Sequence, residues 1–232
     1  MSLRFFLPSI LITATFAFLV SLGFWQLDRA DEKRGIEASI KQANTGSVEL
    51  IMEEGDLLNK EYYEVRLQGK YLSDKQFIYD NQIVNQVSGY YVLTPYALDG
   101  QSKAILINRG FIPWNGRRDK LADIFIEQDA REVKVQISKP IKRMELKPTD
   151  SGIGFPVLIQ SIDLEEMGEI ASVDFSKVIG LLDASSMEGF VRKWEPYTGS
   201  IEKHIGYAIQ WFLMALVLAI IGIRIAIKQR KK

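Results

Sequence analysis

Two long runs without a charged residue, one near each end of the chain, limit what this sequence can fold into. They extend over residues 5–27 and 205–223, which are 23 and 19 residues long. At about 1.5 Å of rise per residue, helices of these lengths cross a hydrocarbon core of about 30 Å. We therefore predict transmembrane helices at residues 5–27 and 205–223. The alternatives are a cleaved signal peptide for the first run, with a poor cleavage site at residues 15–17, and a buried soluble helix for the second.

The charged residues are unevenly distributed, although 29 basic and 29 acidic residues balance overall. Every acidic residue lies between Asp28 and Glu202, whereas five basic residues and no acidic residue follow His204. Lysine and arginine gather on the cytoplasmic side of membranes, which predicts a basic cytoplasmic tail at residues 224–232 and, with two spans, both termini in the cytoplasm. Residues 28–203 then lie outside: in the periplasm, for a multi-pass protein of the inner (cytoplasmic) membrane of a bacterium, or in the intermembrane space of a mitochondrion. The balanced charge argues against a nucleic-acid-binding protein.

The segment between the two runs has the pattern of a β-rich domain. Short stretches rich in Val, Ile, Tyr and Phe, separated by turn residues, predict strands at residues 62–72, 76–79, 89–98, 103–112, 131–138, 156–162, 178–184 and 189–194. Helices are expected at residues 117–127 and 163–169, and residues 28–43 could continue the first span. The predicted fold is two transmembrane helices flanking an extracytoplasmic, mainly antiparallel β domain, built as a barrel or a sandwich.

The sequence excludes most catalytic chemistry, because it holds no cysteine and a single histidine, His204. Disulfides, thiolate metal sites and a cysteine nucleophile are therefore absent. A Ser-His-Asp triad would have to use His204 at the membrane border, and no Gly-x-Ser-x-Gly elbow is present. The number of acidic residues does not exclude a catalytic pair of carboxylates like that of glycosidases. Acidic residues scattered over the surface are, however, the more common arrangement.

His204 lies where the charged region meets the second apolar run. On a helix it shares one face with Ala208, Trp211 and Ala215, and Tyr207 flanks that face. Imidazole is an axial ligand of haem iron, and a flat apolar ligand could lie against the small residues beside it. The alternative is that His204 simply lies at the membrane–water interface, with Tyr207 and Trp211 as members of the aromatic belt that membrane helices have there. This arrangement is the more common one in membrane proteins.

Two glutamines stand at the same predicted border of the membrane, one on each span. Gln210 is an amide inside a hydrocarbon run, which is costly without a partner, so we expect it to face the other helix or a ligand. Trp25 and Gln26 lie at the corresponding depth of the first run, and Arg29 follows them. Arg29 could meet a carboxylate or a haem propionate. Mutual packing of the two helices and contact with lipid headgroups explain these residues equally well.

Four segments of the chain carry a family resemblance: GFWQLDRADEK (23–33), DNQ followed by GYYVLTP (80–95), ILINRGFIPW (105–114) and KHIGYAIQWF (203–212). In sequence, order and spacing they resemble the surfeit locus protein 1 family of cytochrome c oxidase assembly factors. The resemblance covers essentially the whole chain. Two departures occur: the family often has Asn-Arg where this chain has Asn81-Gln82, and commonly a tryptophan at Phe111.

The resemblance implies a membrane-anchored factor that binds haem a and helps insert it into the catalytic subunit of a haem-copper oxidase. Its expected partners are that subunit, the haem a synthase and membrane lipid. His204 is the implied haem iron ligand. The other implied cofactor-binding residues are Tyr207, Gln210, Trp211, Trp25, Gln26 and Arg29.

Three functions stay open at this stage. The first is the haem a factor, which makes and breaks no substrate bond. The second is a cofactor-free scaffold that holds an oxidase assembly intermediate, and it should tolerate alanine at His204. Its expected partner-binding residues are Asn108, Arg109, Gly110 and Trp114. The third is an enzyme using carboxylates, which should keep its activity in a fragment of residues 43–196.

Overall fold

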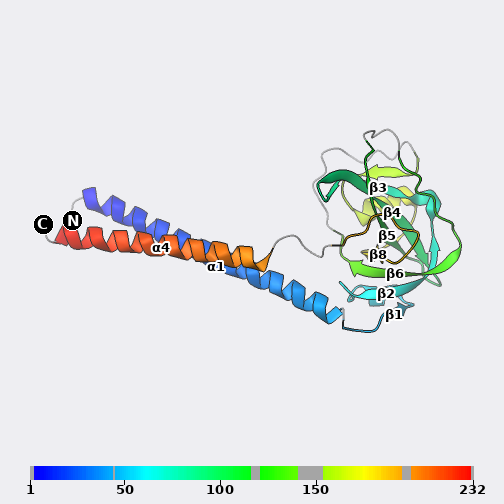
Figure 1. Ribbon diagram of the computed structural model, residues 1–232, viewed down its shortest axis with the longest axis horizontal. Coiled ribbons are helices and arrows are strands. Elements are labelled where there is room, and N and C mark those ends of the chain that lie inside the picture. Colours follow the sequence, from blue (N-terminus) through cyan, green and yellow to red (C-terminus); the bar gives the residue numbers. More distant parts are fainter. Residues whose placement is uncertain (1–2, 44, 116–120, 141–153, 195–199, 231–232) are drawn as a thin grey trace. The chain divides into compact units, whose positions relative to one another are not determined.

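The structure, a computed structural model, describes residues 3–43, 45–115, 121–140, 154–194 and 200–230 (Figure 1). The chain forms two compact units. The helix unit comprises Met1–Ser39 and Tyr197–Lys232, and the β unit comprises Ile40–Pro196. The chain therefore leaves the helix unit once and returns to it after completing the β unit.

The helix unit is built from two long apolar helices, α1 (Leu3–Ala43) and α4 (Ile201–Arg230), and the last turn of α1, from Ile40, belongs to the β unit. Both are long and apolar enough to cross a membrane, which indicates a membrane protein. The helix α1 continues to Ala43, as predicted for residues 28–43, so each helix is longer than the run that predicts a span. Ser200 begins α4 as its cap, because both its hydroxyl and its carbonyl oxygen lie 3.2 Å from the amide nitrogen of Lys203.

The two helices of this unit run antiparallel, and Figure 1 shows the start of α1 beside the end of α4. Ile12 lies against Gly222, and the rings of Phe24 and Phe212 meet edge to face with centroids 5.4 Å apart. Gly23 permits this approach, because a Cβ there would lie 2.5 Å from the Phe212 ring. Small residues that bring two helices close are typical of membrane helix pairs.

The β unit is a mixed sheet of eight strands within the described residues, which confirms the predicted fold class of two apolar helices around a β domain. The strands are β1 (Glu49–Ile51), β2 (Glu64–Tyr71), β3 (Phe77–Val84), β4 (Val87–Leu98), β5 (Ala104–Pro113), β6 (Ala130–Ser138), β7 (Val157–Ile159) and β8 (Phe175–Leu182). The short helices are α2 (Glu54–Leu57), the 3-10 turn Ser73–Lys75 and α3 (Leu164–Ala171), which Asp163 caps through its carboxylate.

Five of the strands close into a ring, so the domain is barrel-like. The order along the sheet is β1-β2-β6-β8-β5-β4-β3-β7, and a further pairing joins the end of β4 back to β2. In that closing pair Gly69 is opposite Leu98 and Tyr71 is opposite Tyr96. Most pairings are antiparallel, as expected, but β1–β2, β3–β7 and β5–β8 are parallel, which the sequence did not predict.

The barrel interior is filled by alternate side chains of its strands. On β2 these are Val65, Leu67 and Tyr71, and Val133, Val135 and Ile137 of β6 face the same core. A second cluster lies on the outer side of β4 and β5, beneath α3 and β7, and includes Leu93, Leu106, Met167 and Phe175. Because cores lie on both sides of β5, nine of its ten residues are buried.

Two segments differ from their predicted structure. In the helix predicted at residues 117–127, the described residues from 121 onward form neither helix nor strand. Ile124 and Ile126 are buried, whereas Phe125 between them is 72% exposed. This alternation has the two-residue period of an extended chain with one face packed against the barrel. The strand predicted at residues 189–194 is reduced to a single bridge between Val191 and Phe111.

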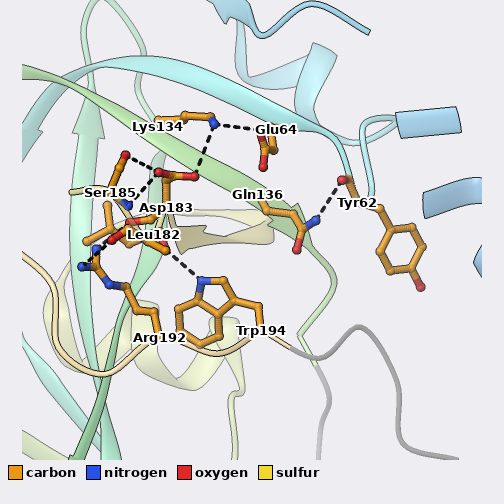
Figure 2. A network of polar contacts seen from close by, with 10 residues as sticks. Tyr62, Glu64, Lys134, Gln136, Leu182, Asp183, Ser185, Arg192 and Trp194 are labelled. Carbon is orange, nitrogen blue, oxygen red and sulfur yellow. Dashed lines mark hydrogen bonds and ion pairs between the residues drawn. The ribbon is translucent and has the colours of Figure 1, made fainter. Parts of the chain in front are cut away.

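A polar network fastens the last part of the β unit to the barrel (Figure 2). Lys134 on β6 bridges Glu64 on β2, at 2.7 Å, and Asp183 after β8, at 3.3 Å. Burial alone would raise the pKa of Asp183, but hydrogen bonds from Ser185 and the charge of Lys134 lower it overall. The indole of Trp194 donates to the carbonyl of Leu182 at 2.8 Å. These contacts fix where the chain leaves the β unit on its way to α4.

Candidate functional site

The only histidine of the chain is hydrogen-bonded across the helix pair. His204 lies in the first turn of α4, and its Nδ1 is 2.7 Å from the amide oxygen Oε1 of Gln26 on α1. His204 is half-buried, whereas Gln26 is 9% exposed. The structure therefore joins two of the residues that the sequence placed at the same membrane border.

Gln26 occupies the packed face of α1. Gly23, Gln26 and Ala30 are spaced by three and four residues, so they share one side of the helix, and all three are buried. An amide in such a position needs a partner, because an unpaired polar group in apolar surroundings costs about 2–7 kcal/mol. His204 supplies that partner.

The face of α4 on which the sequence predicted room for a flat ligand is buried in the structure. Ala208 and Ala215 are 1% and 2% exposed, and Trp211 is half-buried. The small residues below His204 therefore serve close packing rather than forming an open platform. Among the predicted site residues on α4, Tyr207 follows His204 most closely in sequence, and its side chain is 51% exposed.

The remaining predicted site residues do not converge on His204. Trp25 is 51% exposed on α1. Arg29 forms an ion pair with Glu32 at 2.5 Å, and each side chain is 50% exposed. Gln210 is exposed and has no hydrogen bond within the described residues, so Gln26, not Gln210, is the amide that bridges the two helices.

The donor set at His204 fits haem better than a bare metal ion. No group of three or more metal-binding side chains occurs in the described part of the chain. A bare ion would find one imidazole ligand here, whereas the iron of haem is already held by its macrocycle and would take His204 as a ligand from the protein. With Nδ1 engaged by Gln26, Nε2 is the nitrogen left for that role. His204 would hold the iron, and the exposed apolar surface of the helix pair suits the macrocycle.

The Asn-Arg-Gly segment, predicted to bind a partner, forms a β-bulge inside β5. Tyr91 is paired with Phe111 and Leu93 with Asn108, so Arg109 and Gly110 are both opposite a single residue of β4. Gly110 has a φ of 121°, a conformation that favours glycine, and the side-chain oxygen of Asn108 accepts from its amide nitrogen at 3.0 Å. The bulge turns the Arg109 side chain into the protein.

Arg109 is a buried cation held mainly by neutral oxygens. It is 2% exposed, and it donates to the carbonyl of Glu188 at 2.9 and 3.1 Å, to the carbonyl of Ile124 at 2.8 Å and to the amide oxygen of Gln76 at 3.0 Å. Its guanidinium also lies over the Phe190 ring, 5.1 Å from the centroid. Burial lowers the pKa of Arg109. These contacts tie two irregular segments to the barrel.

This arrangement gives Asn108, Arg109 and Gly110 an internal structural role, since the side chains of Asn108 and Arg109 are buried. Trp114 is half-buried and donates from its indole nitrogen to Asp80 at 3.0 Å, and its ring packs against Tyr90 with centroids 4.5 Å apart and planes tilted by 51°. Sequence reasoning missed Gln76 and the 183–192 segment as partners of this corner. The available signal was one arginine inside an apolar strand, which in a folded domain must find several acceptors.

Comparison with known proteins connects this architecture to one family. The model of the SURF1 family matches residues 13–216, which include the whole β unit, most of α1 and the first half of α4. A SURF1-like protein of Rickettsia felis is 26% identical over 219 residues, covering 92% of this chain and 94% of the relative. The SURF1-like protein of Rickettsia bellii is 27% identical over 90% of this chain and 87% of its own length. In Monosiga brevicollis a SURF1-like protein is 28% identical over 40% of each chain. The chain therefore belongs to the SURF1 family, which is known generally as a family of oxidase assembly factors and not of enzymes.

Proposed function

We propose that this protein binds haem a through His204 and aids its insertion into the catalytic subunit of a haem-copper cytochrome c oxidase. The observation that carries the proposal is the contact between Gln26 and Nδ1 of His204, which leaves Nε2 as the ligating nitrogen. Haem a is largely apolar, so it can stay in contact with lipid while its iron is ligated at the end of a membrane helix. The haem a synthase would be the source of the haem and the catalytic subunit its destination.

Loss of the imidazole should remove haem from the protein. We expect the full-length protein, produced with the haem a synthesis enzymes and purified in detergent, to show a reduced haem a band in its optical spectrum. In His204→Ala the haem content per protein should fall about tenfold or more, because the chain has no second imidazole to act as the axial ligand. Imidazole added to the buffer should restore part of the band.

The matched control is Ser21→Ala, which removes a hydroxyl that bonds only to its own helix at the Phe18 carbonyl. This variant should carry as much haem as the wild type, and far-UV circular dichroism should show equal helix content in all three proteins. A His204→Ala protein that retains its haem would refute the assignment of the ligand.

The proposal includes an orientation in the inner membrane. Residues 5–27 and 205–223 would span it, with residues 28–203 in the periplasm and residues 224–232 in the cytoplasm, and the basic tail supports this direction. Because the chain has no cysteine and Met187 is 98% exposed, Met187→Cys gives a single labelling site on the β unit. We expect an impermeant maleimide to label Met187→Cys in intact spheroplasts, and Lys231→Cys only after lysis. The reverse pattern would exclude this orientation.

A cofactor-free scaffold is the second candidate, and exposed apolar residues on the β unit favour it. Ile83 and Val87, at the turn between β3 and β4, are 74% and 47% exposed. Such residues offer a contact surface to a client subunit. The two functions separate at His204, because a scaffold should support oxidase assembly equally well with alanine there.

A further inference from the structure

The tautomer of the single histidine is determined by the atom it contacts. Oε1 of Gln26 is a carbonyl oxygen, which can accept a hydrogen bond but cannot donate one. At 2.7 Å from this oxygen, Nδ1 of His204 forms a hydrogen bond only in the tautomer that carries the proton on Nδ1. In a neutral imidazole the lone pair then lies on Nε2. A free histidine in water prefers the opposite tautomer, with the proton on Nε2.

The position of Gln26 is itself set by the packing of the helix pair. Gly23, one turn earlier, lets the Phe212 ring approach closely, and the Phe24 and Phe212 rings meet edge to face. These contacts set the level at which α1 and α4 are aligned, so the amide of Gln26 reaches the first turn of α4. Since Gln26 is buried, its side chain has little freedom to turn away.

Metal-binding histidines in proteins commonly donate their other ring N–H to a carbonyl or carboxylate oxygen. That outer contact fixes the tautomer and the ring orientation and raises the basicity of the ligating nitrogen, and its loss typically costs 10–100-fold in affinity. The contact between Gln26 and His204 has this form. It explains why an amide is tolerated in the apolar contact between two membrane helices.

We propose that Gln26 is a positioning residue: it holds His204 in the Nδ1–H tautomer, so that Nε2 is presented as a ligand, and it sets the ligand strength of that nitrogen. The first half concerns the protein alone. The second half rests on the proposed haem a function.

Nitrogen NMR tests the first half without haem. The protein has one histidine, so full-length protein labelled with 15N-histidine in detergent micelles gives a single pair of ring nitrogens. At about pH 9, where an imidazole is neutral, we expect the wild type to show a protonated Nδ1 and an unprotonated Nε2. In Gln26→Leu, of similar size but without an acceptor, the protonated nitrogen should change to Nε2. Ser21→Ala should match the wild type.

Gln26→Glu keeps an acceptor at the same position and should therefore keep the Nδ1–H tautomer. Gln26→Asn retains the amide but shortens the side chain by one methylene, so it should behave as Gln26→Leu does. A wild type with Nε2 protonated, or a Gln26→Leu protein that keeps Nδ1–H, would overturn the proposal.

Haem binding tests the second half. Haem a affinity should fall 10–100-fold in Gln26→Leu, and the reduction potential of the haem should become more negative in Gln26→Glu, because a carboxylate makes the imidazole a stronger donor. Unchanged affinity and potential in both variants would overturn the tuning role. If instead His204→Ala retains haem, the proposed function fails, and the NMR result still decides the tautomer.

Discussion

Replacing Arg109 by alanine is expected to lower the free energy of unfolding of the β unit by about 3–5 kcal/mol. The substitution leaves the amide oxygen of Gln76 and the carbonyl oxygens of Ile124 and Glu188 without the donor they have in the native protein. Each buried acceptor left unsatisfied costs about 1–3 kcal/mol. Removal of a buried cation recovers part of that cost, so the total should stay below the sum of the three terms.

Urea denaturation of the full-length protein in mild detergent measures this change, followed by the fluorescence of Trp114 and Trp194 in the β unit. The midpoint should fall while the denaturant dependence stays similar. Arg109→Lys should lie between alanine and the wild type, since one ammonium group cannot reach all of the acceptors that the planar guanidinium reaches.

The control for this measurement is Arg66→Ala. Arg66 pairs with Glu132 at 3.5 Å, and both side chains are more than 40% exposed, so its loss should cost less than about 1 kcal/mol. A stable Arg109→Ala protein that fails in oxidase assembly would contradict the structural role and favour the partner-binding role predicted from the sequence. A destabilised protein would show that loss of function at this corner follows from loss of the fold.

Gly69→Val is expected to destabilise the β unit by about 3 kcal/mol or more, because it forces apart the two strands that close the barrel. A Cβ at Gly69 would lie 2.1 Å from the carbonyl oxygen of Ala97 and 2.9 Å from the Tyr96 ring. The nearer atom belongs to the backbone, so relief requires a shift of β4 and not only a change of rotamer. The register between Gly69 and Leu98 would be lost with it.

The same denaturation experiment applies, with Gly55→Ala as the matched control. Gly55 lies in α2 with no atom within 4 Å of an added Cβ, so alanine there should be neutral or stabilise by up to about 1 kcal/mol. Equal stability of Gly69→Val and the wild type would mean that the barrel does not depend on close contact between β2 and β4.

Several features of the fold were predictable because they depend on neighbours in sequence. Absence of charge over a whole run predicts an apolar helix whatever it later packs against, and alternation of residues such as Val65 and Leu67 predicts a strand with one buried face. The helix predicted at residues 163–169 forms as α3, beginning after Asp163, a residue type that caps helices. At residues 121–127 the same reasoning failed, because burial of Ile124 and Ile126 against the barrel outweighed local helix preference.

The partners of these elements were not predictable from the sequence. Nothing local distinguishes a barrel from a sandwich; the distinction arises where Gly69 meets the far end of β4, 28 residues later at Ala97. Arg109 could equally have faced outward on β5, and only the bulge opposite β4 turned it inward.

Gln26 and Gln210 illustrate the same division at the candidate site. Each is an amide in an apolar helix at the same expected border. The sequence by itself determined the two helices and the lone His204, and it predicted a partner for Gln210. Only the tertiary structure decided that Gln26 is buried on His204 while Gln210 is exposed. The physical reason is that an amide on one helix finds a partner only if it lies on the face that packs against the other helix. Which faces pack together depends on contacts between residues about 180 positions apart, such as Gln26 and His204.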